Sequence, residues 1–359
     1  MANTCLEFKN ICMEFPGVKA LSDVSFAINT GETHALMGAN GAGKSTLIKI
    51  LARVYQQTSG DVILNGENLN KVTPGNIRDH GIEFIFQELE LVPGFTVAQN
   101  IMIGIEPRKG GMVDWKKMNE FAQKALDDFM PGVVDATESI DNLSVAKQQL
   151  VCIVRALSRN PKILVLDEPT SRLSATETEA LFEAIRRVRT RQEITIIYIS
   201  HRLEELFKIC DCVTILRDGV YTGTWPLSEM TQEDIVYRMV GQVKKSGEHL
   251  PPNPEMLAKK SIFDVEHLNL PGVIEDVSFH VRPGEILALT GAVGAKKTEI
   301  FETIMGIRPG GTGTVRINGQ EAKISGPRSA KNHGICLIPE DRRKNGIIQD
   351  FSVRENMTF

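Results

Sequence analysis

Residues 38–46 of the chain read GANGAGKST, which fits the phosphate-binding loop pattern G-x-x-x-x-G-K-[ST]. A strand-like apolar run (33–37) precedes this loop and a helix-like run (46–51) follows it, as the pattern requires. Glycines let backbone N–H groups wrap the phosphates, the lysine adds positive charge, and the serine hydroxyl can ligate Mg²⁺. A glycine-rich turn without a ligand is the alternative, and the lysine and hydroxyls disfavour it. The predicted nucleotide-binding residues are Gly38, Ala39, Asn40, Gly41, Ala42, Gly43, Lys44, Ser45 and Thr46.

A second stretch, residues 163–170, reads ILVLDEPT and carries two adjacent carboxylates. Its four apolar residues predict a buried strand that ends at Asp167 and Glu168, at the sheet edge where open α/β folds bind ligands. We expect Asp167 to hold Mg²⁺ and Glu168 to polarise the water that attacks the phosphate. Two solvated acids at a strand end are the alternative, which the phosphate loop upstream makes less plausible.

Strand and helix patterns alternate along the first part of the chain. Residues 194–199 and 213–216 are nearly continuous β-branched and leucine runs, as strands buried on both faces require. Ser174 and Glu177 form a capping box that predicts the start of a helix. Residues 112–160 carry mostly helical patterns and can form a separate lobe. The predicted fold is α/β with a mostly parallel sheet.

The chain repeats itself. Residues 21–46 match residues 274–299, and one constant offset holds over some 60 residues, as expected for duplicated domains (roughly 20–50 residues is typical of shorter repeats). A polar segment with three prolines separates the copies and suits a linker. We therefore predict a first domain at 1–241, a linker at 242–260 and a partial second domain at 261–359.

Composition limits the classes of partner. The formal net charge of −4 in 359 residues gives no basic surface for nucleic acid, so we expect no nucleic-acid partner. The longest apolar runs are strand-sized, and the N-terminal residues lack the pattern of a signal peptide. We expect a chain that neither spans a membrane nor is secreted.

On these motifs the chain resembles the ATP-binding subunits of ABC transporters, and especially the tandem-cassette subunits of bacterial ribose, galactose and xylose importers. The resemblance implies a P-loop NTPase fold of the ABC ATPase type, with antiparallel β and helical subdomains. Further matching segments are FQELELVPGFTVAQN (86–100), LSVAKQQ (143–149), SRLSATE (171–177), SHRLEE (200–205), GAVGAKKTE (291–299) and IPEDRRKNG (338–346).

The resemblance also implies roles for single residues. Gln87 would contact Mg²⁺ or the attacking water, and His201 would contact the γ-phosphate. Phe15 lies where the family stacks an aromatic ring on adenine, although packing in the core is an equally good reading. The signature residues that would face a nucleotide bound by the opposite cassette are Ser144, Val145 and Ala146.

The second copy departs from the first. Lys296 stands at the position of Gly43, and Glu340 at that of Gln87, so we expect weak or altered nucleotide binding there. Residues 261–359 contain no counterpart of the signature, of the carboxylate pair or of His201. Three explanations remain open: a fragment of a longer product, a truncated product with impaired activity, or two chains that pair head-to-tail. The missing half of the sheet predicts exposed apolar surface.

The function implied by the resemblance is ATP hydrolysis, with Mg²⁺, that energises monosaccharide import through a separate integral-membrane permease. A periplasmic or extracellular sugar-binding protein would be an indirect partner, a homodimer is possible, and the chain would lie peripherally on the cytoplasmic face of the inner membrane. An ATP-binding but catalytically impaired remnant is the main alternative. A tandem-cassette protein acting on ribosomes or nucleic acid fits the short linker and negative charge poorly.

Overall fold

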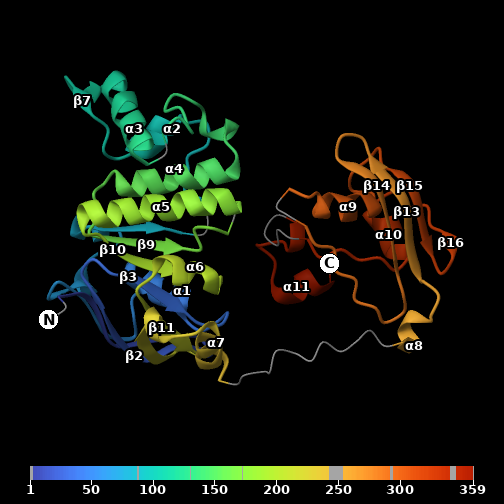
Figure 1. Cartoon of the computed structure of the whole chain (residues 1–359), viewed down its shortest axis with the longest axis horizontal. Helices are drawn as coiled ribbons and strands as arrows, with labels where there is room; N and C mark the ends of the chain where they lie inside the picture. Colours follow the sequence, from blue (N-terminus) through green and yellow to red (C-terminus); the bar gives the residue numbers. More distant parts are fainter. Residues whose placement is uncertain are drawn as a thin grey trace. The chain divides into compact units, whose positions relative to one another are not determined.

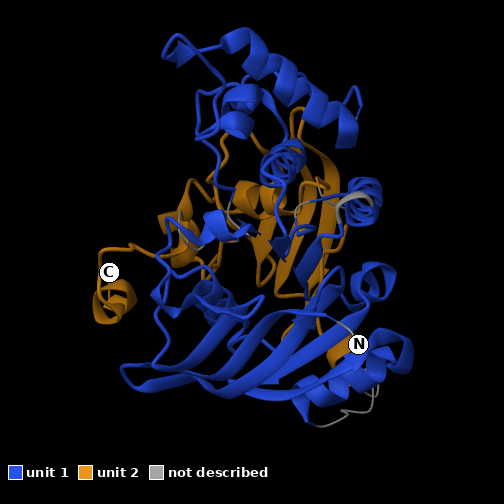
Figure 2. Cartoon of the chain, turned by 90° about the vertical axis from the view of Figure 1, so that its left-hand side faces the viewer, with its two compact units in different colours: residues 1–246 blue, residues 247–359 orange. Residues whose placement is uncertain are grey.

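The computed structural model describes residues 3–86, 89–129, 131–171, 173–241, 254–291, 294–339 and 345–358. The chain divides into two compact units, unit 1 (1–246) and unit 2 (247–359), which Figure 2 colours separately. The division falls inside the segment 242–260 that the sequence indicates as a linker. The domain borders at 241 and 261 stay predictions.

Unit 1 is built on one large mixed sheet. Its strands are β1 (Thr4–Phe15), β2 (Val18–Asn29), β3 (Thr33–Met37), β4 (Ser59–Leu64), β5 (Glu67–Asn68), β6 (Ile82–Ile85), β9 (Ile163–Asp167), β10 (Thr195–Ile199), β11 (Cys212–Arg217) and β12 (Val220–Pro226). Among the described residues their order is β5-β4-β1-β2-β12-β11-β3-β10-β9-β6. The run β11-β3-β10-β9-β6 pairs in parallel, whereas β1, β2, β4 and β5 pair antiparallel. The predicted α/β fold with a parallel core and an antiparallel subdomain is confirmed.

Seven helices accompany this sheet within the described part of unit 1. They are α1 (Lys44–Leu51), α2 (Val97–Met102), α3 (Trp115–Phe129), α4 (Val145–Leu157), α5 (Ala175–Gln192), α6 (Leu203–Ile209) and α7 (Gln232–Val240), and a short hairpin, β7 (Arg108–Lys109) and β8 (Met112–Val113), precedes α3. Helices α4 and α5 lie side by side against β9 and β10 (Figure 1). The predicted helical pattern at 112–160 corresponds mainly to α3 and α4. The predicted capping box of Ser174 and Glu177 begins α5.

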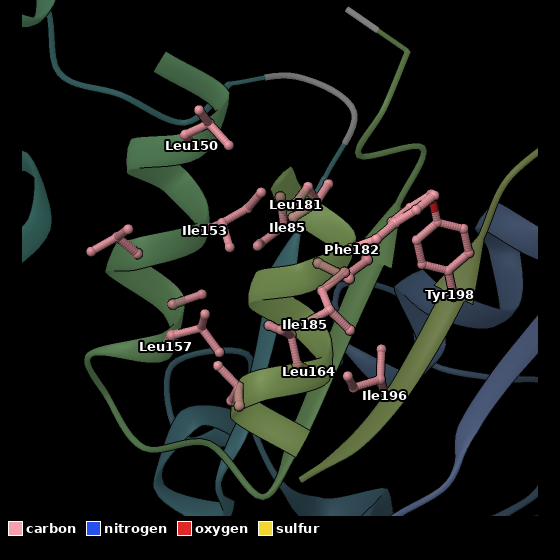
Figure 3. Close-up of a cluster of buried hydrophobic side chains, with 14 of the residues drawn as sticks. Ile85, Leu150, Ile153, Leu157, Leu164, Leu181, Phe182, Ile185, Ile196 and Tyr198 are labelled. Carbon is pink, nitrogen blue, oxygen red and sulfur yellow. The ribbon is translucent and has the colours of Figure 1, made fainter. Parts of the chain in front are cut away.

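The central strands are apolar throughout because both of their faces are covered. On β9, Leu164 and Leu166 join the core under α4 and α5, while Ile163 and Val165 join a second core that includes α1. Figure 3 shows the first of these cores, with side chains from both helices meeting those of β9 and β10. The packed sheet holds the carboxyl ends of β3, β9 and β10 in fixed positions, and the candidate site lies there.

Unit 2 repeats only part of this architecture. Its described strands are β13 (Phe263–Leu270), β14 (Ile274–Val281), β15 (Thr312–Ile317) and β16 (Gln320–Glu321), in the order β14-β13-β15-β16. Its helices are α8 (Pro254–Leu257), α9 (Lys297–Ile304), α10 (Pro327–Asn332) and α11 (Val353–Thr358). By the offset of the repeat, α9, β15 and β16 correspond residue for residue to α1, β4 and β5.

The segments of unit 2 that correspond to β3 and β6 are residues 286–290 and 335–338. Neither enters a ladder with another described strand. Ile286 is 97% exposed and Ile338 is 93% exposed, whereas Ile85, the counterpart of Ile338 on β6, is 5% exposed. The predicted exposure of apolar surface in the second copy is confirmed.

Candidate nucleotide-binding site

The loop between β3 and α1 is shaped for glycine at two positions. A Cβ on Gly38 would lie 2.4 Å from the Leu216 carbonyl oxygen, and one on Gly43 would lie 2.5 Å from Leu21 Cδ2. Gly43 also has φ 96° and caps the N-terminus of α1. Both positions therefore leave no room for a side chain, and the loop backbone packs directly against β2 and β11, as a tight phosphate-binding loop requires.

Lys44 lies across this loop. Its Nζ donates hydrogen bonds to the carbonyl oxygens of Gly38 (2.7 Å) and Ala39 (3.0 Å). Burial lowers the pKa of the Lys44 ammonium, and the carboxylates of Glu168 and Asp167 act in the opposite direction. The structure thus brings the phosphate loop and the carboxylate pair, which are far apart in the sequence, into one electrostatic site.

The carboxylate pair follows β9 as predicted. Burial raises the pKa of the Asp167 carboxyl, and the adjacent charge of Glu168 raises it further, while Lys44 and Lys49 lower it. A carboxylate held in this way gains from a nearby cation, so this donor set fits a divalent ion. The Ser45 hydroxyl, exposed on the first turn of α1, is the second predicted ligand.

Glu168 adopts a left-handed backbone (φ 49°) immediately after β9. Its N–H donates to the Ile199 carbonyl oxygen (2.8 Å), which ties the turn to the end of β10. His201 follows β10, and its Nδ1 lies 3.2 Å from Glu168 Oε1. The His201 side chain is 63% exposed, so the pair opens to solvent, where a water and a phosphate can approach. The predicted base and the predicted histidine therefore meet.

The remaining predicted residues, the signature residues and Phe15, have other surroundings than Lys44, Glu168 and His201. Ser144 and Val145 are exposed at the N-terminus of α4, whereas Ala146 is buried. The first two therefore lie on the surface of unit 1. Phe15, at the end of β1, is half-buried and makes an edge contact with Tyr55 (5.4 Å between centroids). This contact is compatible with both readings of Phe15.

Some predicted positions fall outside the described residues. They are Gln87 and, in the second copy, Glu340.

In unit 1 the other residues of the phosphate loop are mostly accessible: Ala39, Asn40 and Gly41 are exposed, Ala42 is buried, and Thr46 is half-buried on α1. The loop therefore presents an open surface next to Lys44.

The sequence patterns did not identify Glu205, although its carboxylate accepts hydrogen bonds from the loops that follow both β9 and β10. A signal for it exists. Glu205 lies four residues before the buried Ile209 on α6, and the helical period directs both inward, whereas Glu204 is exposed.

The second loop keeps part of this geometry. Lys297 Nζ donates to the Gly291 carbonyl oxygen (2.6 Å), as Lys44 does to Gly38. Lys296 replaces Gly43 and takes the same left-handed conformation, with φ 62°. The loop therefore accommodates Lys296, although a left-handed backbone is unfavourable for a residue that has a Cβ.

Comparisons with known proteins find the same family in both units of the chain. The family model described as ABC transporter matches residues 21–171 and 274–357. The ribose import ATP-binding protein RbsA of Geobacillus kaustophilus is 41% identical over 356 residues, covering 99% of this chain and 71% of that protein. The xylose import ATP-binding protein XylG of Brucella abortus is 40% identical over 369 residues, covering 100% of this chain and 71% of that protein. Among solved structures, MJ1267, an ATP-binding cassette of an ABC transporter, has a TM-score of 0.57 and 26% identity, covering 66% of this chain and 94% of that one.

Proposed function

Because the chain belongs to the ABC transporter family, we propose that it binds and hydrolyses ATP to energise the import of a monosaccharide. The observation that carries the proposal is the convergence of three segments of unit 1. Lys44, the carboxylate pair at Asp167 and Glu168, and His201 come from different parts of the sequence and meet at one edge of the sheet. The named import proteins support the class of solute.

The residues have separable roles. The loop N–H groups and Lys44 hold the β- and γ-phosphates and offset their charge. Glu168 accepts the proton of a water whose oxygen attacks the γ-phosphorus, while the bond from that phosphorus to the bridging oxygen breaks and ADP leaves. His201, 3.2 Å from Glu168, orients the water and the γ-phosphate. Ser45 and Asp167, with Gln87 as a further proposed ligand, would hold a Mg²⁺ ion, which would neutralise part of the phosphate charge when bound.

The proposed partners lie outside this chain. Among the described residues no helix is long and apolar enough to cross a bilayer. From the likeness to the import ATP-binding proteins, we propose that solute crosses through a separate integral-membrane permease, on whose cytoplasmic side the chain docks as a peripheral subunit, and that a sugar-binding protein delivers the solute to the permease. The signature residues Ser144 and Val145, exposed at the N-terminus of α4, are available to a second cassette in the same chain or in another copy.

The proposal is tested with the purified chain and with the chain reconstituted with the permease. Calorimetric titration with MgATP and steady-state phosphate release are measured for the unmodified protein and for Lys44→Ala. We expect binding and turnover in the former, and strongly weakened binding with loss of turnover in the latter. Binding that Lys44→Ala leaves intact would exclude the loop as the nucleotide site.

A second candidate is a nucleotide-binding protein without turnover. It is favoured by unit 2, where the described residues that correspond to β3 and β6 pair with no strand, so the second loop lacks the sheet that supports the first. Tight MgATP binding with no phosphate release, unchanged when the permease is added, would support this candidate and overturn hydrolysis for the chain as given.

A further inference from the structure

We propose that Glu205 is a positioning residue for hydrolysis, because its buried carboxylate joins the loop that carries Glu168 to the loop that carries His201. Its part in hydrolysis rests on the proposed function. The geometric part, that Glu205 sets the position of His201 relative to Glu168, stands on the contacts of unit 1 alone.

Three hydroxyl groups from two segments converge on this one carboxylate, which lies on α6 and is 5% exposed. Thr170 Oγ1 donates to Glu205 Oε1 (2.7 Å) and lies 2.9 Å from Oε2. Tyr198 OH and Ser200 Oγ each donate to Oε2 at 2.8 Å. Thr170 belongs to the loop after β9, Tyr198 to β10 and Ser200 to the loop after β10, so Glu205 connects all three.

The contacts of Thr170 and Ser200 lie within two residues of the reacting groups. Thr170 is two residues beyond Glu168, and the intervening turn is closed by the Ser171 N–H, which donates to the Glu168 carbonyl oxygen (3.2 Å). On the other side Ser200 directly precedes His201, and the Arg202 N–H donates to Ser200 Oγ (3.0 Å). A shift of the carboxylate is therefore passed to both sides of the contact between Glu168 and His201.

The burial of the Glu205 carboxylate is energetically unfavourable in itself, which indicates that its role is to hold the two loops in position. Burying a carboxylate is unfavourable unless hydrogen bonds or a cation compensate for the lost water. Among the described residues, Arg202 is the cation that pairs with Glu205: its Nη1 lies 3.4 Å from Oε1, and its own side chain is 44% exposed. Burial raises the pKa of Tyr198, and the charge of Glu205 raises it further, so Tyr198 stays a hydrogen-bond donor. An apolar side chain would fill the space more cheaply but would connect nothing.

Glu205→Gln keeps the shape and removes the charge, and the amide group faces hydroxyls that previously only donated. Glu204→Gln is the matched control, since Glu204 is the exposed neighbour on the same helix. Thr170→Val is a second variant, which removes the bond to one loop and leaves the carboxylate with its other donors.

The test uses ring spectra of the whole chain labelled with ¹⁵N-histidine, recorded without nucleotide. The chain has seven histidines, and His201→Gln assigns the His201 signal. Glu168→Gln calibrates the shift that follows loss of the contact. We expect Glu205→Gln to move the His201 signal in the same direction and by a comparable amount, with the other rings and the Glu204→Gln spectrum unchanged.

An unmoved His201 signal in folded Glu205→Gln overturns the proposal. If Glu205→Gln does not fold, Thr170→Val decides in the same way.

A kinetic measurement is the second test. In steady-state hydrolysis we expect Glu205→Gln to lower kcat by about 10-fold or more with KM for ATP nearly unchanged, as loss of positioning predicts. An equal fall for Glu204→Gln would contradict this. A chain that binds ATP but releases no phosphate refutes hydrolysis, and the ring spectra still decide the role of Glu205.

Discussion

Residues 33–37 and residues 286–290 occupy the same place in the two copies of the repeat, yet only the first are a strand. In unit 1, β3 lies between β10 and β11 and is buried along its whole length. In unit 2 the corresponding residues form no ladder with any described strand, and Ile286 is almost fully exposed. The helix that follows the loop is nevertheless present in both units, as α1 and α9.

The difference separates local from long-range causes. The turn, the left-handed residue before the helix and the helix itself form from nearby residues and survive in both copies. A central parallel strand depends on partners far along the chain, because parallel pairing needs long crossover connections. Chemistry that requires the carboxyl ends of several parallel strands is therefore expected from unit 1, and the following variants test this division.

The largest effect is expected from Glu168→Gln. Removing the general base should lower kcat for phosphate release by about 1000-fold while MgATP still binds, since proton acceptance is worth ~100- to 10,000-fold. Single-turnover release and calorimetric binding measure the two steps. If the variant turned over ATP nearly as fast as the unmodified chain, the assignment of hydrolysis to unit 1 would be contradicted, because a site outside unit 1 would then hydrolyse ATP.

The paired lysines give the next effect. Lys44→Ala should weaken MgATP binding by about 100-fold, which corresponds to losing charge-assisted hydrogen bonds worth about 3 kcal/mol, whereas Lys297→Ala should change it by less than about 3-fold. Calorimetric titration of both variants makes the comparison. Equal losses would mean that the second loop binds nucleotide as well as the first.

A smaller effect is expected at the paired isoleucines. Ile85→Val should lower the free energy of unfolding of unit 1 by about 1 kcal/mol, and Ile338→Val should leave unit 2 within about 0.5 kcal/mol. Urea unfolding followed by tryptophan fluorescence reports unit 1, which contains both Trp115 and Trp225, and circular dichroism adds unit 2. A loss at Ile338 as large as that at Ile85 would show that 335–338 is covered in solution.

The smallest effect is expected at Lys296. Lys296→Gly should stabilise unit 2 by about 0.5 kcal/mol, because a left-handed backbone costs a residue with a Cβ about 1 kcal/mol and glycine returns part of this gain as entropy. Glu299→Gln controls for the ion pair between Lys296 and Glu299 (3.4 Å). Destabilisation by Lys296→Gly beyond that of the control would indicate that the second loop has its own side-chain requirement.

Much of unit 1 could be predicted from sequence because its strongest signals are local. The phosphate loop has a fixed spacing, β9 and β10 are apolar on both faces, and Ser174 with Glu177 begins α5 as expected. The state of 286–290 could not be predicted in the same way, because its pattern resembles that of 33–37 and its fate depends on distant partners.

The site shows the same limit. Lys44, Asp167 and Glu168 were identified by motif, and His201 by resemblance, since each belongs to a recognisable segment. The left-handed turn at Glu168 depends on tertiary packing, and composition and spacing do not contain that information. The helical spacing of Glu205 and Ile209 does favour Glu205 over Glu204 as the buried acid, but it does not show which hydroxyl groups the carboxylate meets.

The position of β3 in the sheet also has a consequence for synthesis of the chain. The phosphate loop leaves the ribosome early, but the strands that flank β3 are β10 and β11, and the contact between Gly31 N and Thr195 Oγ1 already spans 164 residues. Until residue 199 has emerged, residues 33–37 lack both neighbouring strands, and until residue 217 has emerged they still lack one of the two. The nucleotide site is thus encoded first and completed among the last parts of unit 1, and ATP has a finished cradle only after β11 has been made.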